Sequence, residues 1–205
     1  MQDFNKEYYL IVMDMDERNP SMTPDEDTAN RSFSYQELPL GTKPLIFHDG
    51  ALDWKLRKGI APLKNPPELL FCGTDVLVQD GLREKLLDME IPNLALQPSI
   101  YIDHQDQWHE NYWYLTFLER FDCWDRKASD YEREPITIGN VALYSVYEYS
   151  LNQELLAKTP LKDRLLFKMG GTSPAPVLAH VSVAKYFNKS GAIVLPVTEY
   201  GVSYP

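Results

Sequence analysis

Cysteine is scarce in this 205-residue chain, which contains only Cys72 and Cys123. The two residues are far apart in sequence and match no metal-ligand or redox spacing. Small secreted domains held by disulfides need several cysteines at short spacings, so that class of protein is excluded. We therefore expect two free, buried thiols and a reducing, cytoplasmic location.

Long apolar runs and an excess of basic residues are also missing. The apolar run at residues 8–13 is too short for the core of a signal peptide or for a membrane-spanning helix. The chain has 20 basic and 30 acidic residues, and its net charge is −10. An acidic protein repels nucleic acids and anionic membranes and favours basic partners. We expect a protein partner, no nucleic acid and no membrane.

Catalytic signatures are absent as well. Residues 182–185 read Ser-Val-Ala-Lys, but the segments that would complete a penicillin-binding-type site stand in the wrong order. The glycines at 170–171 are followed by prolines instead of the helix that an anion-binding loop requires. The sequence has no nucleophile elbow and no dinucleotide fingerprint. We expect no catalytic residue and no cofactor.

Residue types that bind metals gather in one polar loop at residues 103–110. His104, Asp106, His109 and Glu110 are all of the kinds that bind divalent cations. They lack the spacing of a helical metal motif, and no second cluster elsewhere in the sequence supports them. We expect a solvated acidic loop and no metal site.

The composition that remains is that of a globular α+β protein. Hydrophobic residues make up 44% of the chain and aromatic residues 12%, enough for a core within a single domain, residues 1–205. Apolar periodicity predicts mixed sheets with a few helices. The expected strands include residues 7–14 and 94–102, and the expected helices are 80–89, with Asp80 as its N-terminal cap, and 150–158.

The segment YWYLTFLERFDCWD, residues 112–125, alternates with the period of a β-strand. Its odd positions are nearly all apolar and its even positions are mixed, which predicts a central strand packed on one side. We expect this odd-numbered face to be buried; it comprises Trp113, Leu115, Phe117, Phe121 and Cys123.

Two segments, residues 69–100 and 165–198, indicate a weak internal repeat. Each begins with Leu-Leu-Phe, reaches a Val-Leu pair, enters a predicted helix and ends in a strand that contains a proline, Pro98 or Pro196. We expect the helices at 80–89 and 181–188 to occupy equivalent places in two related halves.

Five segments resemble those of the bacterial immunity protein family eleven. They are YYLI, VLVQDGLREKLLD, IPNLALQPSIYI, YWYLTFLERFDCWDRKAS and RLLF with VLAHVSVAKYFNKSGAIVLP, and FDCWDRKAS is the most distinctive. The resemblance implies a cytoplasmic antidote that is encoded beside a polymorphic toxin of interbacterial competition and acts by binding that toxin. The family supplies no catalytic residues and leaves the activity of the toxin open.

We therefore expect an immunity protein that neutralises a cognate, basic toxin domain by stoichiometric binding. Two alternatives are a binding adaptor unrelated to toxins and an enzyme with an acidic site around Asp122, Asp125 and His104. Acidic loops that carry an aromatic residue are the expected contacts, because charge speeds association and tryptophan is common at interface hot spots. The expected partner-binding residues are Asp103, Asp106, Trp108, Glu110, Asp14, Asp16, Glu17, Asp25, Glu26, Asp27, Asp122 and Asp125.

Overall fold

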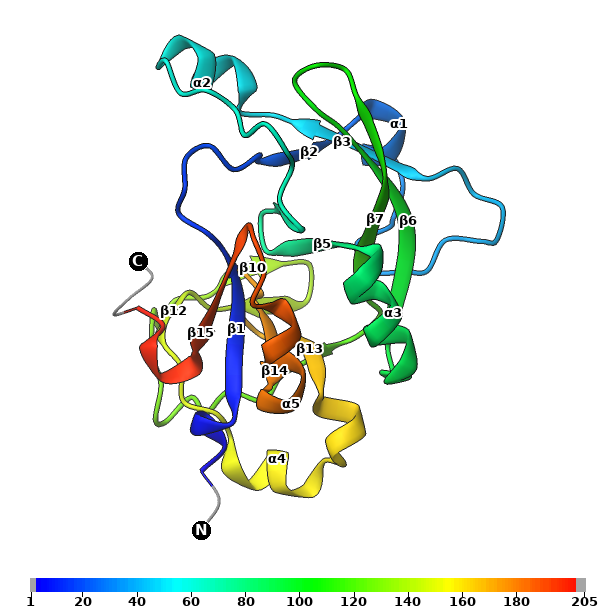
Figure 1. The fold of residues 1–205 in the computed structure, drawn as a ribbon. Helices are drawn as coiled ribbons and strands as arrows, with labels where there is room; N and C mark the ends of the chain where they lie inside the picture. Colours follow the sequence, from blue (N-terminus) through cyan, green and yellow to red (C-terminus); the bar gives the residue numbers. More distant parts are fainter. Residues whose placement is uncertain (1–2, 202–205) are drawn as a thin grey trace. The chain divides into compact units, whose positions relative to one another are not determined.

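The computed structural model of the protein describes residues 3–201 and has an α+β fold with mixed sheets and short helices, as the sequence predicts (Figure 1). Contacts divide the chain into two compact units. Unit 1 consists of Met1–Val12, Glu119–Asn188 and Ile193–Pro205, and unit 2 of Met13–Leu118 and Lys189–Ala192. Each unit therefore draws on segments that are distant in sequence.

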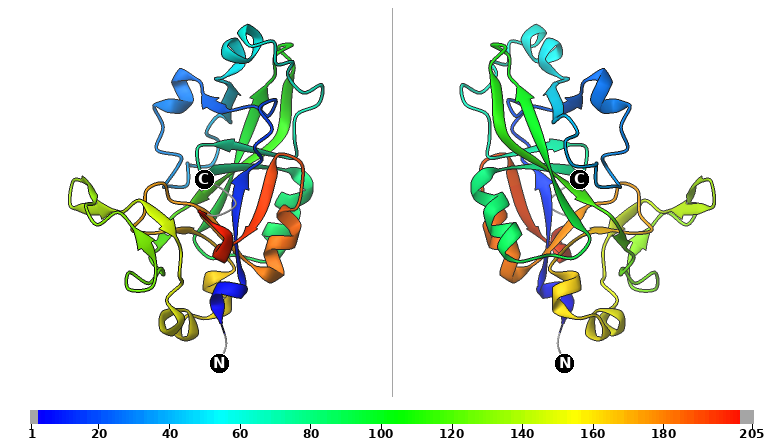
Figure 2. Two further views of the ribbon diagram at one scale, coloured as in Figure 1. Left: turned by 90° about the vertical axis from the view of Figure 1, so that its left-hand side faces the viewer. Right: turned by 90° about the vertical axis from the view of Figure 1, so that its right-hand side faces the viewer.

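Unit 2 contains a six-stranded sheet with the order β2-β3-β6-β7-β5-β4. Its only parallel pair is β3 with β6 among the strands that the structure describes. The strands are β2 (Met22–Pro24), β3 (Leu45–Asp49), β4 (Leu69–Cys72), β5 (Asp75–Gln79), β6 (Leu94–Ile102) and β7 (Trp108–Phe117). The helices are α1 (Glu26–Ala29), α2 (Leu52–Arg57) and α3 (Asp80–Asp88). In the views of Figure 2, β6 and β7 form a long twisted ribbon that continues past their neighbours to a turn.

Helix α3 packs on β5 and β7 and buries Leu82 and Leu86, which lie one helical turn apart. The predicted helix is present, but the prediction that Asp80 caps it is wrong, because Gln79 holds the cap position without a side-chain hydrogen bond. The Asp80 carboxylate instead accepts a hydrogen bond from Nε1 of Trp113 at 2.7 Å. The residue types therefore predict the helix correctly, while the role of the Asp80 carboxylate is determined by a tryptophan on the neighbouring strand β7.

The aromatic segment 112–125 is not one continuous strand packed on one side. Strand β7 ends at Phe117, Leu118 is exposed, and the chain then enters unit 1. Tyr112 and Tyr114 are fully buried although they occupy even positions, because that face of β7 contributes to an aromatic core while α3 packs on the strand. Leu115 and Phe117 are buried as predicted, whereas Trp113 and Phe121 are partly exposed. The Arg83 guanidinium lies 3.7 Å from the Trp113 ring centroid.

Unit 1 contains a five-stranded sheet with the order β15-β1-β14-β13-β8 and two further two-stranded sheets, β9 with β12 and β10 with β11. The strands are β1 (Tyr8–Met13), β8 (Arg120–Phe121), β9 (Asp130–Tyr131), β10 (Ile136–Ile138), β11 (Val141–Leu143), β12 (Val146–Glu148), β13 (Leu166–Met169), β14 (Val177–His180) and β15 (Ala192–Pro196). The helices are α4 (Gln153–Lys158) and α5 (Val181–Ala184), with 3-10 turns η1 (Phe4–Lys6), η2 (Leu161–Arg164), η3 (Lys185–Phe187) and η4 (Val197–Glu199). Cys123 and Trp124 lie in the core of this unit.

The two segments of the expected repeat contain the same succession of elements. β4 and β5 form an antiparallel pair followed by α3 and β6, and β13 and β14 form an antiparallel pair followed by α5 and β15. In each sheet one strand from elsewhere in the chain, β7 or β1, lies between the second and third strands of the segment. Helix α5 is shorter than the predicted helix at 181–188 and continues as η3. Superposition of the two segments tests the repeat.

Both cysteines are free, as expected, and Cys123 is buried in unit 1. The expectation that Cys72 is also buried is wrong, because this residue at the end of β4 in unit 2 is partly exposed. Burial raises the pKa of the Cys123 thiol, because the apolar surroundings disfavour the charged thiolate. Its sulfur lies 3.9 Å from that of Met169. Among residues 3–201, no helix is long and apolar enough to cross a membrane.

Candidate functional site

The turn that joins β6 to β7 and the first residues of β7 carry exposed acidic and aromatic side chains in unit 2. We name residues 103–110 the acidic turn. A hydrogen bond from the Asp106 backbone N–H to the Asp103 carbonyl closes it at 3.0 Å, and the Asp103 N–H donates to the Gln107 carbonyl at 3.0 Å. Asp106 has a φ of +59°, a left-handed conformation that aspartate tolerates better than most residues. The expected solvated loop is therefore a compact hairpin turn.

Asp103 holds this turn together with its carboxylate. Oδ1 accepts hydrogen bonds from the backbone N–H groups of Gln105 and Gln107 at 2.8 and 3.0 Å, and Oδ2 lies 2.8 Å from Nε2 of His109. Burial of the carboxylate acts to raise its pKa, but these hydrogen bonds outweigh burial and keep the pKa of Asp103 below its usual value. Asp103 is thus committed to the turn, and any contribution to partner binding comes through the shape that it imposes.

The outer surface of the acidic turn carries the side chains that are accessible to a partner. Trp108 pairs across the strands with Ile102 and leaves 54% of its surface exposed. Asp106 and Glu110 are exposed on either side of it in sequence. His109 stacks on Tyr101, with the ring centroids 5.8 Å apart and the planes at 21°. An exposed tryptophan on a turn fixed by its own hydrogen bonds can contact a partner with little loss of conformational entropy.

The first part of the expected segment 14–27 approaches the acidic turn. One small hollow is lined by Arg18, Pro20, Asp49, Tyr101, Asp103 and His104, together with Pro62, Leu63 and Pro66. Asp16 forms a bidentate pair with Arg18, at 2.6 Å from Oδ2 to Nη2, and the hydrogen bonds from Arg18 lower the pKa of Asp16 to about 2. Asp14 accepts the Asp16 N–H at 3.2 Å, and Glu17 is exposed. Two segments predicted separately therefore meet at one place in unit 2.

One of the residues that line the same hollow, Asp49, forms a buried ion pair with Lys55. Nζ of Lys55, a residue only 2% exposed, lies 2.7 Å from Oδ2 of Asp49 and donates to the Asn19 carbonyl at 2.5 Å. The other carboxylate oxygen of Asp49 accepts the N–H groups of Ser21 and Ala51. Sequence reasoning missed this pair, because a lysine inside a basic run on α2 gives no signal of burial. The pair fixes the segment that carries Arg18 to β3 and α2.

The second part of the segment 14–27 has a local structural role. Asp25 caps α1 by accepting the Thr28 N–H at 2.7 Å, and Asp27 forms an ion pair with Arg31. Burial acts to raise the pKa of Asp25, and the hydrogen bonds from Thr28 bring it below its usual value. Glu26 is exposed in the first turn of this helix. None of these three residues lines the hollow.

Asp122 and Asp125 belong to unit 1, whereas His104 belongs to unit 2. The Asp122 carboxylate forms two 2.6 Å contacts with the guanidinium of Arg126, and Asp125 accepts the Lys127 N–H at 2.8 Å. Both aspartates therefore stabilise the local path of the chain after Trp124. The three residues of the expected acidic enzyme site are divided between two separate units.

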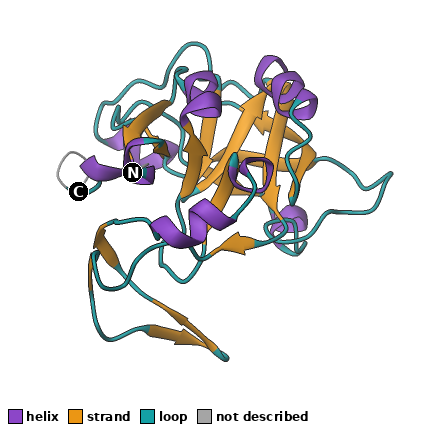
Figure 3. Cartoon of the chain, turned by 90° about the horizontal axis from the view of Figure 1, so that it is seen from below, coloured by secondary structure: helices purple, strands orange, loops and turns teal. Residues whose placement is uncertain are grey.

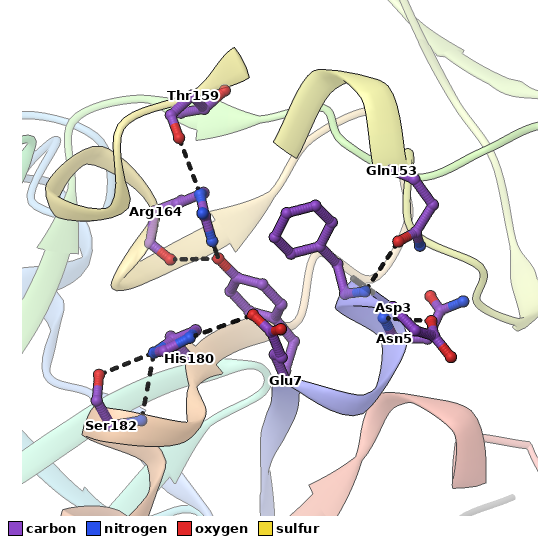
Figure 4. A network of polar contacts seen from close by, with 10 residues as sticks. Asp3, Asn5, Glu7, Gln153, Thr159, Arg164, His180 and Ser182 are labelled. Atoms are coloured by element: carbon purple, nitrogen blue, oxygen red, sulfur yellow. Dashed lines mark hydrogen bonds and ion pairs between the residues drawn. The ribbon is translucent and has the colours of Figure 1, made fainter. Parts of the chain in front are cut away.

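A network of polar contacts in unit 1 contains a serine, a histidine and a carboxylate that sequence reasoning did not connect (Figure 4). Oγ of Ser182 lies 2.8 Å from Nδ1 of His180, and Nε2 of His180 lies 3.5 Å from the Glu7 carboxylate. The Ser182 backbone N–H also donates to Nδ1, at 3.3 Å, so that His180 caps α5. We interpret the group as a helix cap.

Negative charge is concentrated in unit 2. This unit contains eighteen acidic and ten basic residues, a net charge of −8, whereas unit 1 contains twelve and ten, a net charge of −2. The acidic turn and segment 14–27 together supply nine of the eighteen acidic residues. The electrostatic field expected to attract a basic partner therefore originates mainly in unit 2.

Among the described residues, no group of three or more histidine, cysteine, aspartate or glutamate side chains is placed to hold a metal ion.

Comparison with known proteins leaves the resemblance to immunity proteins as a prediction. No protein-family model matches the chain, and no curated protein matches it significantly.

Proposed function

We propose that the protein is a cytoplasmic immunity protein that captures a basic toxin domain in a stoichiometric complex. The observation that carries the proposal is the exposed Trp108 on the acidic turn. Two other residues of this turn, Asp103 and His104, line a small hollow together with Arg18 from the other predicted segment. A net charge of −8 in the same unit supports a basic partner. The resemblance to immunity protein family eleven gives the class of that partner.

In the expected complex, acidic residues determine the rate of association and an aromatic residue determines the rate of dissociation. Asp106 and Glu110 act over distances of about 8 Å at physiological salt and speed the encounter with a basic surface. Trp108 buries its ring in the partner and slows dissociation. Asp103 keeps the turn in its bound shape before the partner arrives, as its three hydrogen bonds already do in the free chain.

The direct test is protection of bacteria from a toxin encoded next to this chain. A large secreted protein with a variable C-terminal domain in the neighbouring reading frame identifies the candidate, and that domain is produced with and without this chain. We expect growth to be restored by co-production and the two proteins to elute together in equal molar amounts. Binding without protection would contradict neutralisation by complex formation. Toxicity with no binding would contradict the proposal and would leave the adaptor unrelated to toxins as the alternative.

A further inference from the structure

Strands β10 and β11 form an arm in unit 1, residues 135–143, whose face is unusually apolar for an exposed hairpin. Figures 2 and 3 show the hairpin extending away from the rest of its unit. Its register pairs Ile136 with Leu143 and Ile138 with Val141. Residues directly opposite each other in an antiparallel pair lie on the same face, so these four aliphatic side chains form one surface.

This surface is exposed in the free chain. Ile136, Ile138 and Val141 leave 54%, 64% and 56% of their surface accessible, and Leu143 is partly buried. In the part of the chain that the structure describes, β10 and β11 pair only with each other. An isolated two-stranded hairpin is marginally stable in water and gains stability when its apolar face packs on something.

The base of the arm is nevertheless fixed to unit 1. The Glu132 N–H donates to the Ser145 carbonyl at 2.9 Å, and the Tyr144 N–H donates to the Gly171 carbonyl at 3.1 Å. The Ser173 N–H donates to the Tyr144 carbonyl at 2.8 Å. At the tip, Gly139 adopts a φ of +60°, as a tight hairpin turn requires. The arm is thus a presented element and differs from an unstructured loop.

The charged residues around the arm limit the kind of partner that the arm can bind. Residues 135–147 contain no charged side chain, although exposed strand edges normally carry charges that prevent association. The exposed acids that flank the arm are Asp130, Glu132, Glu134 and Glu148. The single basic residue among them, Arg133, lies over the Tyr131 ring at 4.2 Å and donates to its hydroxyl. A partner with aliphatic and basic residues complements this arrangement.

We propose that the apolar face of the β10–β11 arm binds an extended segment of a basic polypeptide. Aliphatic side chains of that segment cover Ile136, Ile138 and Val141, and its lysine or arginine side chains lie beside the acids at the base of the arm. A second copy of this chain is a poorer occupant, because each copy carries a net charge of −10. The inference concerns unit 1 and does not depend on the acidic turn of unit 2.

The test uses the full chain labelled with nitrogen-15 and two short capped peptides, one alternating valine with lysine and the other alternating valine with glutamate. We expect the lysine peptide to shift the amide signals of residues 135–143 saturably and the glutamate peptide to leave them unchanged. Ile138→Thr keeps a β-branched residue on the strand but removes apolar area, and it should weaken binding of the lysine peptide about tenfold. Leu87→Thr, at an exposed apolar position in unit 2, is the matched control and should change nothing.

Absence of shifts with the lysine peptide at millimolar concentration would overturn the inference, as would equal shifts with both peptides. A dimer in solution that Ile138→Thr converts to a monomer would assign the face to a second copy and would also overturn it. The assay contains no toxin, so its failure is distinct from failure of the proposed immunity function. Unchanged melting temperatures show that the variants remain folded, since Ile138 is exposed.

Discussion

Oδ2 of Asp103 lies 2.8 Å from Nε2 of His109 and joins the two ends of the acidic turn through side chains. The same carboxylate accepts two backbone N–H groups with its other oxygen. The residue that the sequence suggests as a partner contact is therefore the one that shapes the turn, and the contact surface is left to Asp106, Trp108 and Glu110.

Asp103→Ala should lower the free energy of unfolding by about 1 kcal/mol, because the backbone N–H groups of Gln105 and Gln107 and the His109 ring lose a charged acceptor. Glu110→Ala, in the same turn but exposed, is the matched control and should change stability by less than about 0.5 kcal/mol. Urea titration followed by tryptophan fluorescence measures both. Equal stabilities of the two variants would show that the carboxylate of Asp103 is not holding the turn.

Phe117→Ala should cost about 3–5 kcal/mol of stability, the usual loss for a large aromatic residue in a core. Phe117 is buried at the end of β7, just before the chain leaves unit 2. Leu118→Ala, at the adjacent exposed position, serves as the control. Similar melting temperatures for Phe117→Ala and the parent would contradict the burial of this strand.

The segment 112–125 shows how far the sequence predicts the fold. Alternation of apolar residues correctly indicates a strand and the burial of Leu115 and Phe117. It cannot show that both faces of β7 are covered, because α3 and the residues around Phe33 arrive from distant segments. The division at Leu118 between two units is invisible for the same reason, since nothing in the local pattern marks where the chain changes sheets.

The candidate site is predictable to a similar extent. Acidic residues around Trp108 identify the turn, and prolines near Asp14 and Asp16 indicate an accessible segment. Their meeting at one hollow depends on β3 and β6 lying side by side, a parallel pair that no short-range pattern specifies. The burial of Lys55 and the cap formed by His180 likewise depend on partners distant in space or on a backbone conformation.

Thiol reactivity should separate the two cysteines. Cys72 is partly exposed and should react with a thiol reagent in the native protein, whereas Cys123 is buried and its pKa is raised, so it should react only after unfolding. Titration in native buffer and in denaturant, with Cys72→Ser as the control variant, measures this difference. Rapid modification of Cys123 in native Cys72→Ser would contradict its place in the core of unit 1.

Stability should fall as the pH decreases below about 6.5, partly because of His180. Burial lowers the pKa of this histidine, and nearby Glu7 opposes the shift without reversing it. A lowered pKa means that the unfolded chain binds the proton more tightly, so this loss begins near the unfolded pKa and is complete below the folded one. In His180→Asn, whose Oδ1 reaches about as far from the backbone as Nδ1 and can still cap α5, the loss of stability between neutral pH and pH 5 should be smaller. Identical profiles of stability against pH for the variant and the parent would show that His180 does not contribute to this loss.

The most direct measurement of the central claim is the rate of association with the basic toxin domain as a function of ionic strength. Asp106→Asn combined with Glu110→Gln should slow association several-fold at low salt, and the difference should shrink as salt rises above about 0.15 M, where charges are screened. Trp108→Ala should leave that rate nearly unchanged and speed dissociation by an amount equivalent to about 2 kcal/mol.

The matched control combines Glu84→Gln with Asp88→Asn, which removes the same charge from exposed positions of α3 in the same unit. The account predicts a clearly smaller effect for this control than for the acidic turn. Equal slowing by the two double variants, together with unchanged dissociation of Trp108→Ala, would contradict capture through the acidic turn.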